Sequence, residues 1–267
     1  QPNREISIES LRSAGYSILS CYHIIGPVEM SPINENIYTV NLFQRLDRFV
    51  DGIVTRKRSE IFKRIFKTGA VRLDMIATVL DVGSTKDRLN ESSNYFARQL
   101  SESSSVTLFS DQQIDPQHDI DFSVAGVLVG DASRIGPETG TYDLVLSSAT
   151  IEHAGTVDDQ RRMIACCIRA ARRYVIITTP NRWHPLEFHT RLPVLHWLPR
   201  RWHRRILKAI GFDFFAEENN LNLLDRRELR TMIDVNEQRE RVKSCRLETI
   251  CLFGLVSNLV FILELRE

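Results

Sequence analysis

The sequence lacks both a long hydrophobic run and a large net charge. Its 35 lysines and arginines nearly balance its 34 aspartates and glutamates, so the formal net charge is only +1 over 267 residues. A chain this close to neutral is not expected to coat nucleic acid, although local basic patches have to be assessed separately from the net charge. The longest apolar stretches, such as residues 255–265, fall short of the roughly 18 residues that span a bilayer. The sequence therefore predicts no transmembrane segment.

Cysteine pairs at metal-binding spacing are also missing. The five cysteines form no CxxC pair and do not stand at zinc-ligand spacing with histidine: Cys21, Cys166, Cys167, Cys245 and Cys251. An odd number of cysteines without such a framework is typical of reduced thiols, so we expect a cytoplasmic protein. The chain begins at Gln1 rather than methionine, which leaves a removed leader open.

From residue 76 onward, short β-branched runs alternate with longer mixed segments. Strands are predicted at residues 77–82, 106–109, 126–129, 142–147 and 174–178, and crossover helices at 94–101 and 157–171. This alternation predicts an α/β fold with a mostly parallel sheet covered on both faces. Two further strands at residues 247–253 and 259–265, joined by a tight turn over 254–258, predict an antiparallel C-terminal hairpin at the sheet edge.

Two segments lie outside this alternation. Residues 1–70 predict an N-terminal helical extension, in which residues 42–67 form an amphipathic helix with a basic C-terminal half. Residues 71–267 then form the α/β domain. Within that domain, residues 180–226 hold all three tryptophans and four of the seven histidines, and they predict a cap over the substrate site. The apolar side of the N-terminal helix carries Leu46, Phe49, Val50, Ile53, Ile61, Phe62 and Phe66.

The first predicted strand ends in an acidic residue and a glycine turn, in the stretch TVLDVGSTKD at residues 78–87. In a doubly wound sheet, ligands bind at the carboxyl ends of the strands, near the point where the strand order reverses. Asp81, Gly83 and Ser84 stand at this position. The G-x-G-x-x-G pattern of nicotinamide-binding domains does not follow the strand. A nicotinamide-dependent oxidoreductase is therefore the least favoured interpretation of this chain.

The next three strands supply further candidates for a nucleotide site. Asp111 follows the second strand, where a carboxylate can accept hydrogen bonds from ribose hydroxyls. Asp131 and Ala132 end the third strand, and the fourth carries YDLVLSSATIEH, which includes Ser147 and a Glu-His pair. Taken singly, each aspartate fits a helix N-cap or loop carboxylate equally well. Because aspartates stand at the ends of three successive strands, the set as a whole favours a nucleotide site.

This ordered set resembles the motifs of class I S-adenosylmethionine-dependent methyltransferases over roughly residues 76–265. The resemblance implies a Rossmann-like, seven-stranded sheet. Only Gly83 of the usual loop glycines is present, and Thr85 and Asp87 stand where a second and third are common. That departure favours an alternative, a non-catalytic scaffold or binding subunit with the same fold. The resemblance assigns S-adenosylmethionine to Asp81, Gly83, Ser84, Asp111, Asp131, Ala132 and Ser147.

Four side chains after the fourth and fifth strands are candidates for acid–base chemistry: His153, His184, Glu187 and His189. The last three lie within six residues, in a segment that resembles the histidine-rich cap of small methyltransferases acting on polysaccharides, lipids or secondary metabolites. An imidazole there could deprotonate an acceptor hydroxyl while Glu187 orients it. These side chains could instead bond the cap's own backbone or hold a divalent metal. On this proline-containing loop the sequence predicts no metal site.

Basic residues interleave with Trp197 and Trp202 between residues 191 and 208, where six basic side chains occur and no acidic one. Such a helix can rest on an anionic membrane or grip a phosphate-bearing substrate, or it can be a plain solvated surface. The same alternatives hold for the N-terminal helix with Arg56, Lys57, Arg58, Lys63, Arg64 and Lys67. RNA is disfavoured by the neutral overall charge.

The sequence thus predicts a methyltransferase that uses S-adenosylmethionine to modify an oxygen or nitrogen. The expected acceptor is a small molecule or glycan, with a lipid or nucleotide carrier left open. The inner face of an anionic membrane is left open as a peripheral partner, and nucleic acid is not an expected partner. Because a fold hosts many chemistries, the acceptor itself does not follow from the resemblance.

Overall fold

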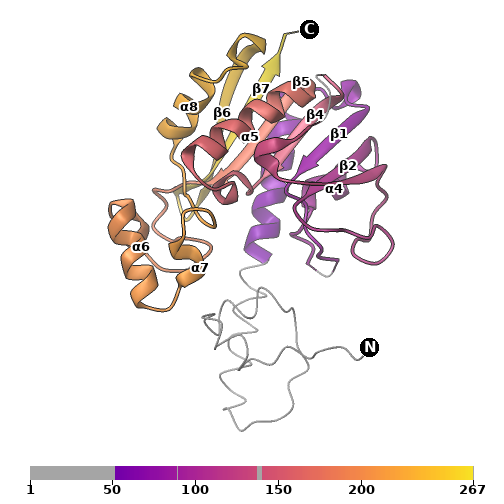
Figure 1. Ribbon diagram of the computed structural model, residues 1–267. Coiled ribbons are helices and arrows are strands. Elements are labelled where there is room, and N and C mark those ends of the chain that lie inside the picture. Colours follow the sequence, from indigo (N-terminus) through magenta and orange to yellow (C-terminus); the bar gives the residue numbers. More distant parts are fainter. Residues whose placement is uncertain (1–51, 89, 137–139, 267) are drawn as a thin grey trace, which may run out of the picture.

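A computed structural model describes residues 52–88, 90–136 and 140–266 of the chain. These residues build a seven-stranded sheet in the order β3-β2-β1-β4-β5-β7-β6, with helices on both faces (Figure 1). Strands β1 to β5 pair in parallel, and β7 runs antiparallel to both of its neighbours. The predicted mostly parallel sheet with an antiparallel C-terminal hairpin is confirmed.

All seven predicted strands are present. Their bounds are β1 (Thr78–Val82), β2 (Ser105–Ser110), β3 (Gly126–Val129), β4 (Tyr142–Ser148), β5 (Ala171–Pro180), β6 (Val242–Leu252) and β7 (Leu255–Leu265). The expected hairpin turn over residues 254–258 was wrong, because Phe253 and Gly254 alone make the turn, with φ of 53° and 80°. Positive φ at both central residues matches the twist of the flanking strands. Ser257 and Asn258, which favoured a turn in the sequence, lie inside β7, and Asn258 pairs with Ile250.

Both predicted crossover helices are also present, and short turns join the other elements. Two helices begin with a capping box, Thr156 with Asp159 and Asp225 with Glu228. Residues 52–62 form a helix that continues into the π-helical turn η1 (Lys63–Lys67), and the later helices are α4 (Tyr95–Leu100), α5 (Val157–Ala170), α6 (Arg200–Ala209), α7 (Asp213–Ala216) and α8 (Arg226–Asp234). The 3-10 turns are η2 (Leu73–Met75), η3 (Ala132–Arg134), η4 (Ile151–His153), η5 (Leu195–Trp197) and η6 (Arg239–Arg241).

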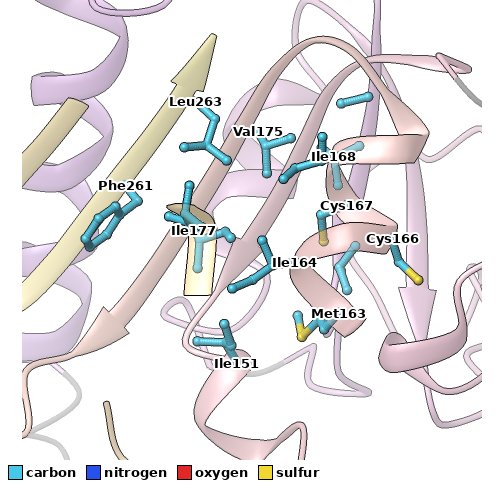
Figure 2. Close-up of a cluster of buried hydrophobic side chains, with 14 of the residues drawn as sticks. Ile151, Met163, Ile164, Cys166, Cys167, Ile168, Val175, Ile177, Phe261 and Leu263 are labelled. Atoms are coloured by element: carbon cyan, nitrogen blue, oxygen red, sulfur yellow. The ribbon is translucent and has the colours of Figure 1, made fainter. Parts of the chain in front are cut away.

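Helices α5 and α8 cover one face of the sheet. The apolar side of α5 packs against β5 and the hairpin, as Figure 2 shows, and α8 adds Leu229 and Ile233 to the same core. Burying these side chains supplies most of the driving force that holds α5 on the sheet. The side chains labelled at this contact include Ile164, Cys167, Ile168, Val175, Ile177, Phe261 and Leu263.

The helix at residues 52–67 and α4 cover the other face. Ile61, Ile65 and Phe66 pack there with Phe96 and Leu100 on apolar side chains of β1, β2 and β4. The described part of the predicted N-terminal extension is therefore one layer of the fold. Residues 42–51 of the expected helix, which include Leu46, Phe49 and Val50, lie outside the described residues.

Part of the basic face of this helix is used inside the fold. Lys57 Nζ donates to the carbonyl of Cys251 at 2.6 Å, and Arg64 Nη1 donates to the carbonyl of Thr249 at 2.8 Å. Both acceptors belong to β6, one of the two edge strands of the sheet. These two cations satisfy carbonyl groups of an edge that would otherwise be open to pairing with another chain.

The segment predicted as a cap contains η5, α6 and α7, and a β-bridge pairs Leu186 with Pro193. Figure 1 shows α6 and α7 together beyond one end of the sheet, away from its covered faces. Cap arginines form ion pairs, Arg200 with Glu228 at 2.7 Å and Arg204 with Glu218 at 3.2 Å. Within the described part of the chain, no helix combines the length and apolar character that crossing a bilayer requires.

Asp143 joins β4 to β1 and is expected to stabilise the fold. Its carboxylate accepts hydrogen bonds from the backbone N–H groups of Ala77 and Thr78, both at 3.0 Å, and from the Thr78 hydroxyl at 3.1 Å. Asp143→Ala leaves these donors without an acceptor and should lower the free energy of unfolding by about 2–4 kcal/mol in urea denaturation. Arg172→Ala removes a half-exposed ion-pair partner and should cost less than about 1 kcal/mol. An equal loss in both variants would contradict this role.

Candidate active site

The turn after β1 packs directly against the segment that follows β4. Gly83 has a φ of +94°, and a Cβ added there would lie 2.0 Å from the Thr150 hydroxyl oxygen. That hydroxyl donates to the carbonyl of Val82 at 3.2 Å. Because both the backbone conformation and the space require glycine, Gly83 fixes the close approach of the two loops.

A cavity of about 130 Å³ lies at the carboxyl ends of β1 and β4. These strands are neighbours in the sheet, with β2 and β3 on one side and β5 on the other, so the cavity is at the point where the strand order reverses. Its lining comes from the helix at residues 52–62, the β1–α4 segment, the start of α4 and the end of β4. The lining residues are Arg58, Asp81, Val82, Gly83, Thr85, Ser93, Asn94, Tyr95, Phe96, Ser148 and Ala149.

Side-chain hydrogen bonds shape the loop that lacks the second and third glycine. The backbone N–H of Thr85 donates to Asn94 Oδ1 at 2.9 Å, and Asn94 Nδ2 donates to the Thr85 carbonyl at 2.8 Å. Asn94 adopts a left-handed conformation with a φ of 50°. Asp87 accepts from the Ser93 hydroxyl and the Asn90 N–H. Thr85 and Asp87 are thus compatible with a closed loop around the cavity.

Two opposite charges meet at the cavity. Burial raises the pKa of Asp81 to about 6, against the opposing effects of a Ser84 hydrogen bond and the Arg58 guanidinium. The Ser84 hydroxyl donates to Asp81 Oδ2 at 2.9 Å, and Arg58 Nη1 donates to the carbonyl of Ser92. Burial lowers the pKa of Arg58, whereas Asp81 and Glu152 raise it. The cavity therefore presents a carboxylate and a guanidinium, which suit a ligand that carries one positive and one negative group.

Arg58 was not among the sequence-predicted site residues. The sequence places it with the other basic residues of the N-terminal helix. Its position nevertheless carries a signal, because it precedes Ile61 by three residues and Phe62 by four. Residues at these spacings share one helix face. An arginine on the apolar face of a helix is expected to meet a buried partner.

The remaining predicted cofactor residues lie in different surroundings. Ser147 is fully buried in β4, and its hydroxyl has no hydrogen-bond partner among the described residues. Asp131 caps η3 by accepting from the Ser133 N–H at 2.8 Å. Asp111 is exposed just after β2. The cavity lining includes Asp81 and Gly83 but not Ser84, Asp111, Asp131, Ala132 or Ser147.

Three of the four acid–base candidates form one hydrogen-bonded chain. His189 Nδ1 lies 2.6 Å from Glu187 Oε1, and His189 Nε2 lies 3.0 Å from His153 Nε2. His153 Nδ1 lies 2.7 Å from the carbonyl oxygen of Asn220. These hydrogen bonds link η4, which follows β4, to the cap segment that follows β5.

Burial and charge set the pKa values of this chain. Burial raises the pKa of Glu187, but His189 and hydrogen bonds from His189 and Thr190 outweigh it and lower the pKa to about 2. Burial lowers the pKa of His189, yet the Glu187 carboxylate raises it above the ordinary value. Burial, together with the nearby His189, lowers the pKa of His153. Glu187 is therefore ionised at neutral pH and orients the His189 ring.

His184 has a different environment from the other three candidates. Its Nδ1 lies 3.0 Å from the Leu186 carbonyl oxygen, its ring stacks on Phe188 at 5.1 Å, and its own carbonyl lies 2.8 Å from His196 Nε2. These contacts fasten the cap's backbone, which is the structural alternative that the sequence left open.

Glu152, which the sequence marks only as part of a Glu-His pair, lies at the same cluster. It is fully buried beside His153, and its Oε2 accepts from the Thr179 hydroxyl at 2.9 Å. Its Oε1 has no hydrogen-bond partner among the described residues and lies 4.0 Å from His189 Nε2. The available sequence signal was the Glu-His pair that follows the fourth predicted strand.

Comparisons with known proteins show similarity in structure alone. No family model and no curated protein matches the sequence. A methyltransferase from Thermotoga maritima, described as SAM-dependent and possibly a histamine N-methyltransferase, matches at 14% identity and a TM-score of 0.50, over 85% of this chain and 96% of that one. The carbon methyltransferase CurJ matches at 9% identity and a TM-score of 0.50, over 80% of this chain and 54% of that one.

A third solved structure carries a different description. A protein from Rhodobacter sphaeroides, described as a putative Zn-dependent alcohol dehydrogenase, matches at 14% identity and a TM-score of 0.50, over 73% of this chain and 87% of that one. At such identities the similarity concerns the fold and leaves the reaction open. Together with the strand order, these likenesses show that the chain has the Rossmann-like fold of class I S-adenosylmethionine-dependent methyltransferases.

Proposed function

We propose that the chain binds S-adenosylmethionine at the cavity between β1 and β4 and transfers its methyl group to an oxygen or nitrogen of a small-molecule or glycan acceptor. The observation that carries the proposal is the placement of Asp81 and Arg58 in a cavity at the switch point of this fold. The structural likenesses support the same donor at the level of the fold.

The charges of the cavity suit the amino-acid end of the donor. The methionine part of S-adenosylmethionine carries an ammonium and a carboxylate, and we assign these to Asp81 and Arg58. The cavity of about 130 Å³ is smaller than a typical ligand site of roughly 300–1,000 Å³, so it suits only this part of the donor. We assign the ribose and the adenine to Asp111 and Asp131, at the ends of the adjoining strands.

The donor supplies an activated methyl group with its own leaving group. The protein must therefore align the acceptor and exclude water. We assign activation of the acceptor to His153 and His189, with Glu187 holding the His189 ring. A hydroxyl acceptor needs such activation, whereas a carboxylate does not. The cap brings His189 to this position. The cap also carries exposed Trp197 and Trp202, which suit an acceptor on a lipid or nucleotide carrier.

A scaffold subunit with the same fold is the second candidate. Thr85 and Asp87 in place of loop glycines favour it. The hydrogen bonds between Thr85 and Asn94 favour the enzyme, because they close the loop without those glycines.

Removal of the Asp81 charge tests the assigned donor site. Asp81→Asn keeps the size of the side chain but loses the charge that pairs with the ammonium, so affinity for S-adenosylhomocysteine should fall at least about tenfold in calorimetry. Asp158→Asn, an exposed change on α5, is the matched control and should bind as the wild type does. Equal affinity in all three proteins would remove Asp81 from the site.

The raised pKa of Asp81 predicts a pH dependence of binding. The ligand prefers the ionised carboxylate, while burial favours the protonated form below a pKa of about 6. Affinity for S-adenosylhomocysteine should therefore be about tenfold weaker at pH 5 than at pH 7, and Asp81→Asn should abolish this difference. Calorimetry at both pH values checks the result. If Asp81→Asn shows the same difference in affinity between pH 5 and pH 7 as the wild type, the titrating group is a different one.

Transfer itself can be followed with a donor that carries a labelled methyl group, screened against sugars, lipid-linked glycans and small metabolites. Once an acceptor is found, His189→Ala should lower kcat by about 10²–10⁴-fold if the acceptor is a hydroxyl. The dissociation constant for S-adenosylhomocysteine should stay unchanged. A kcat equal to that of the wild type would exclude His189 from the reaction.

A further inference from the structure

We propose that Glu152, His153 and His189 bind one divalent transition-metal ion of the zinc type, with a fourth coordination position open. One ligand atom from each side chain lies within 4.8 Å of the other two. His153 Nε2 and His189 Nε2 are 3.0 Å apart, and Glu152 Oε1 is 4.0 Å from His189 Nε2. Ligands about 2.0–2.2 Å from a tetrahedral zinc ion lie about 3.3 Å from one another, and these two distances bracket that value.

The hydrogen bonds of the two Nδ1 atoms turn the Nε2 atoms of the two rings toward each other. His153 Nδ1 must donate to the Asn220 carbonyl, because an unprotonated nitrogen would face an oxygen lone pair at 2.7 Å. His189 Nδ1 likewise donates to Glu187. His189 Nε2 either carries a proton that it donates to His153 Nε2 or faces that atom with a lone pair, at 3.0 Å. A metal ion can take the place of this proton between the two atoms, and a second ring N–H bonded to a carbonyl or carboxylate is the usual support of a metal-bound histidine.

Glu152 supplies an independent observation. Its side chain is completely buried, and Oε1 lacks a hydrogen-bond partner among the described residues. An unpaired carboxylate oxygen in such a place is costly. Glu187 brings a second buried carboxylate to the same cluster. A divalent cation would compensate this negative charge and give Glu152 Oε1 a partner.

The backbone around the three side chains is firmly held. Gln160 Nε2 donates to the Ile151 carbonyl at 3.0 Å, and the Asn222 N–H donates to the Glu152 carbonyl at 2.7 Å. The Thr179 hydroxyl on β5 orients the Glu152 carboxylate. Such support reduces the conformational cost of gathering three ligands around one ion.

The three metal-binding atoms determine which ions fit the site and suggest a role for the ion in activating the acceptor. Two imidazole nitrogens and one carboxylate suit zinc or cobalt, whereas magnesium and calcium prefer oxygen ligands. Three protein ligands leave a position for an oxygen of water or substrate. This last step rests on the proposed methyl transfer: an acceptor hydroxyl at that position would have a lowered pKa, so the ion rather than a free imidazole would activate it.

The sequence predicts no metal site, and the reason is geometric. In the sequence, the residues considered as possible metal ligands are His184, Glu187 and His189, because they are close together along the chain. The proposed ligands come instead from two loops, 36 residues apart at His153 and His189. Only His189 belongs to both sets.

Metal binding can be measured without any acceptor. The full chain is stripped with a chelator and titrated with Zn²⁺ or Co²⁺, with Mg²⁺ as the contrast. We expect one equivalent of Zn²⁺ to bind with a dissociation constant of about 1 μM or tighter, a tetrahedral cobalt absorption spectrum, and no binding of Mg²⁺. Failure of the wild type to bind Zn²⁺ at micromolar concentration would overturn the proposal.

Variants locate the ion. His153→Ala and His189→Ala should each weaken Zn²⁺ binding about 100-fold or more, and Glu152→Gln should weaken it while preserving the buried shape. His118→Ala, which removes an exposed surface histidine, is the control and should bind as the wild type does. Zinc affinity unchanged in Glu152→Gln and His153→Ala would place the ion elsewhere and contradict the site.

Calorimetry with S-adenosylhomocysteine on the same samples separates the two proposals and checks that each variant is folded. Zinc binding without S-adenosylhomocysteine binding supports the metal site and contradicts the proposed function. The opposite result contradicts the metal site and leaves the methyltransferase proposal standing.

Discussion

The close packing of Gly83 against Thr150 is the contact on which the arrangement of the site depends. Any larger residue at position 83 would collide with the Thr150 side chain, and the loops after β1 and β4 would have to separate. The first loop carries Asp81 beside the cavity, and the second leads within three residues to His153. This one contact therefore sets the distance between the proposed donor site and the groups proposed to activate the acceptor.

Around that contact the protein gathers buried charge, which must be compensated. Asp81, Glu152 and Glu187 are all nearly or fully buried. Arg58 opposes the raised pKa of Asp81, and the His189 ring lowers the pKa of Glu187. Buried ionised groups without partners are strongly destabilising and persist mainly where they serve a function. Among the described residues, no side chain donates a hydrogen bond to Glu152 Oε1, and a bound cation would complete this balance of charge.

Much of the fold could be predicted from the sequence because hydrophobic periodicity reports burial directly. The strands from Thr78 to Pro180 and helix α5 follow from runs of apolar and β-branched residues. The hairpin turn was misplaced because Ser257 and Asn258 are polar, yet both lie within β7. Asp81 and Gly83, which line the cavity, could be named as candidates from the sequence because a motif is local. Arg58 and Glu152 were not identified as site residues, since their roles depend on contacts with segments distant in sequence.

The central claim is that the cavity at the β1–β4 switch point binds the methyl donor, and titration of the wild-type chain tests it most directly. Calorimetry should show micromolar binding of S-adenosylmethionine and S-adenosylhomocysteine and no binding of NAD. Binding of neither methyl compound would contradict the account and favour a scaffold role. Binding of NAD alone would assign the cavity to a nicotinamide cofactor.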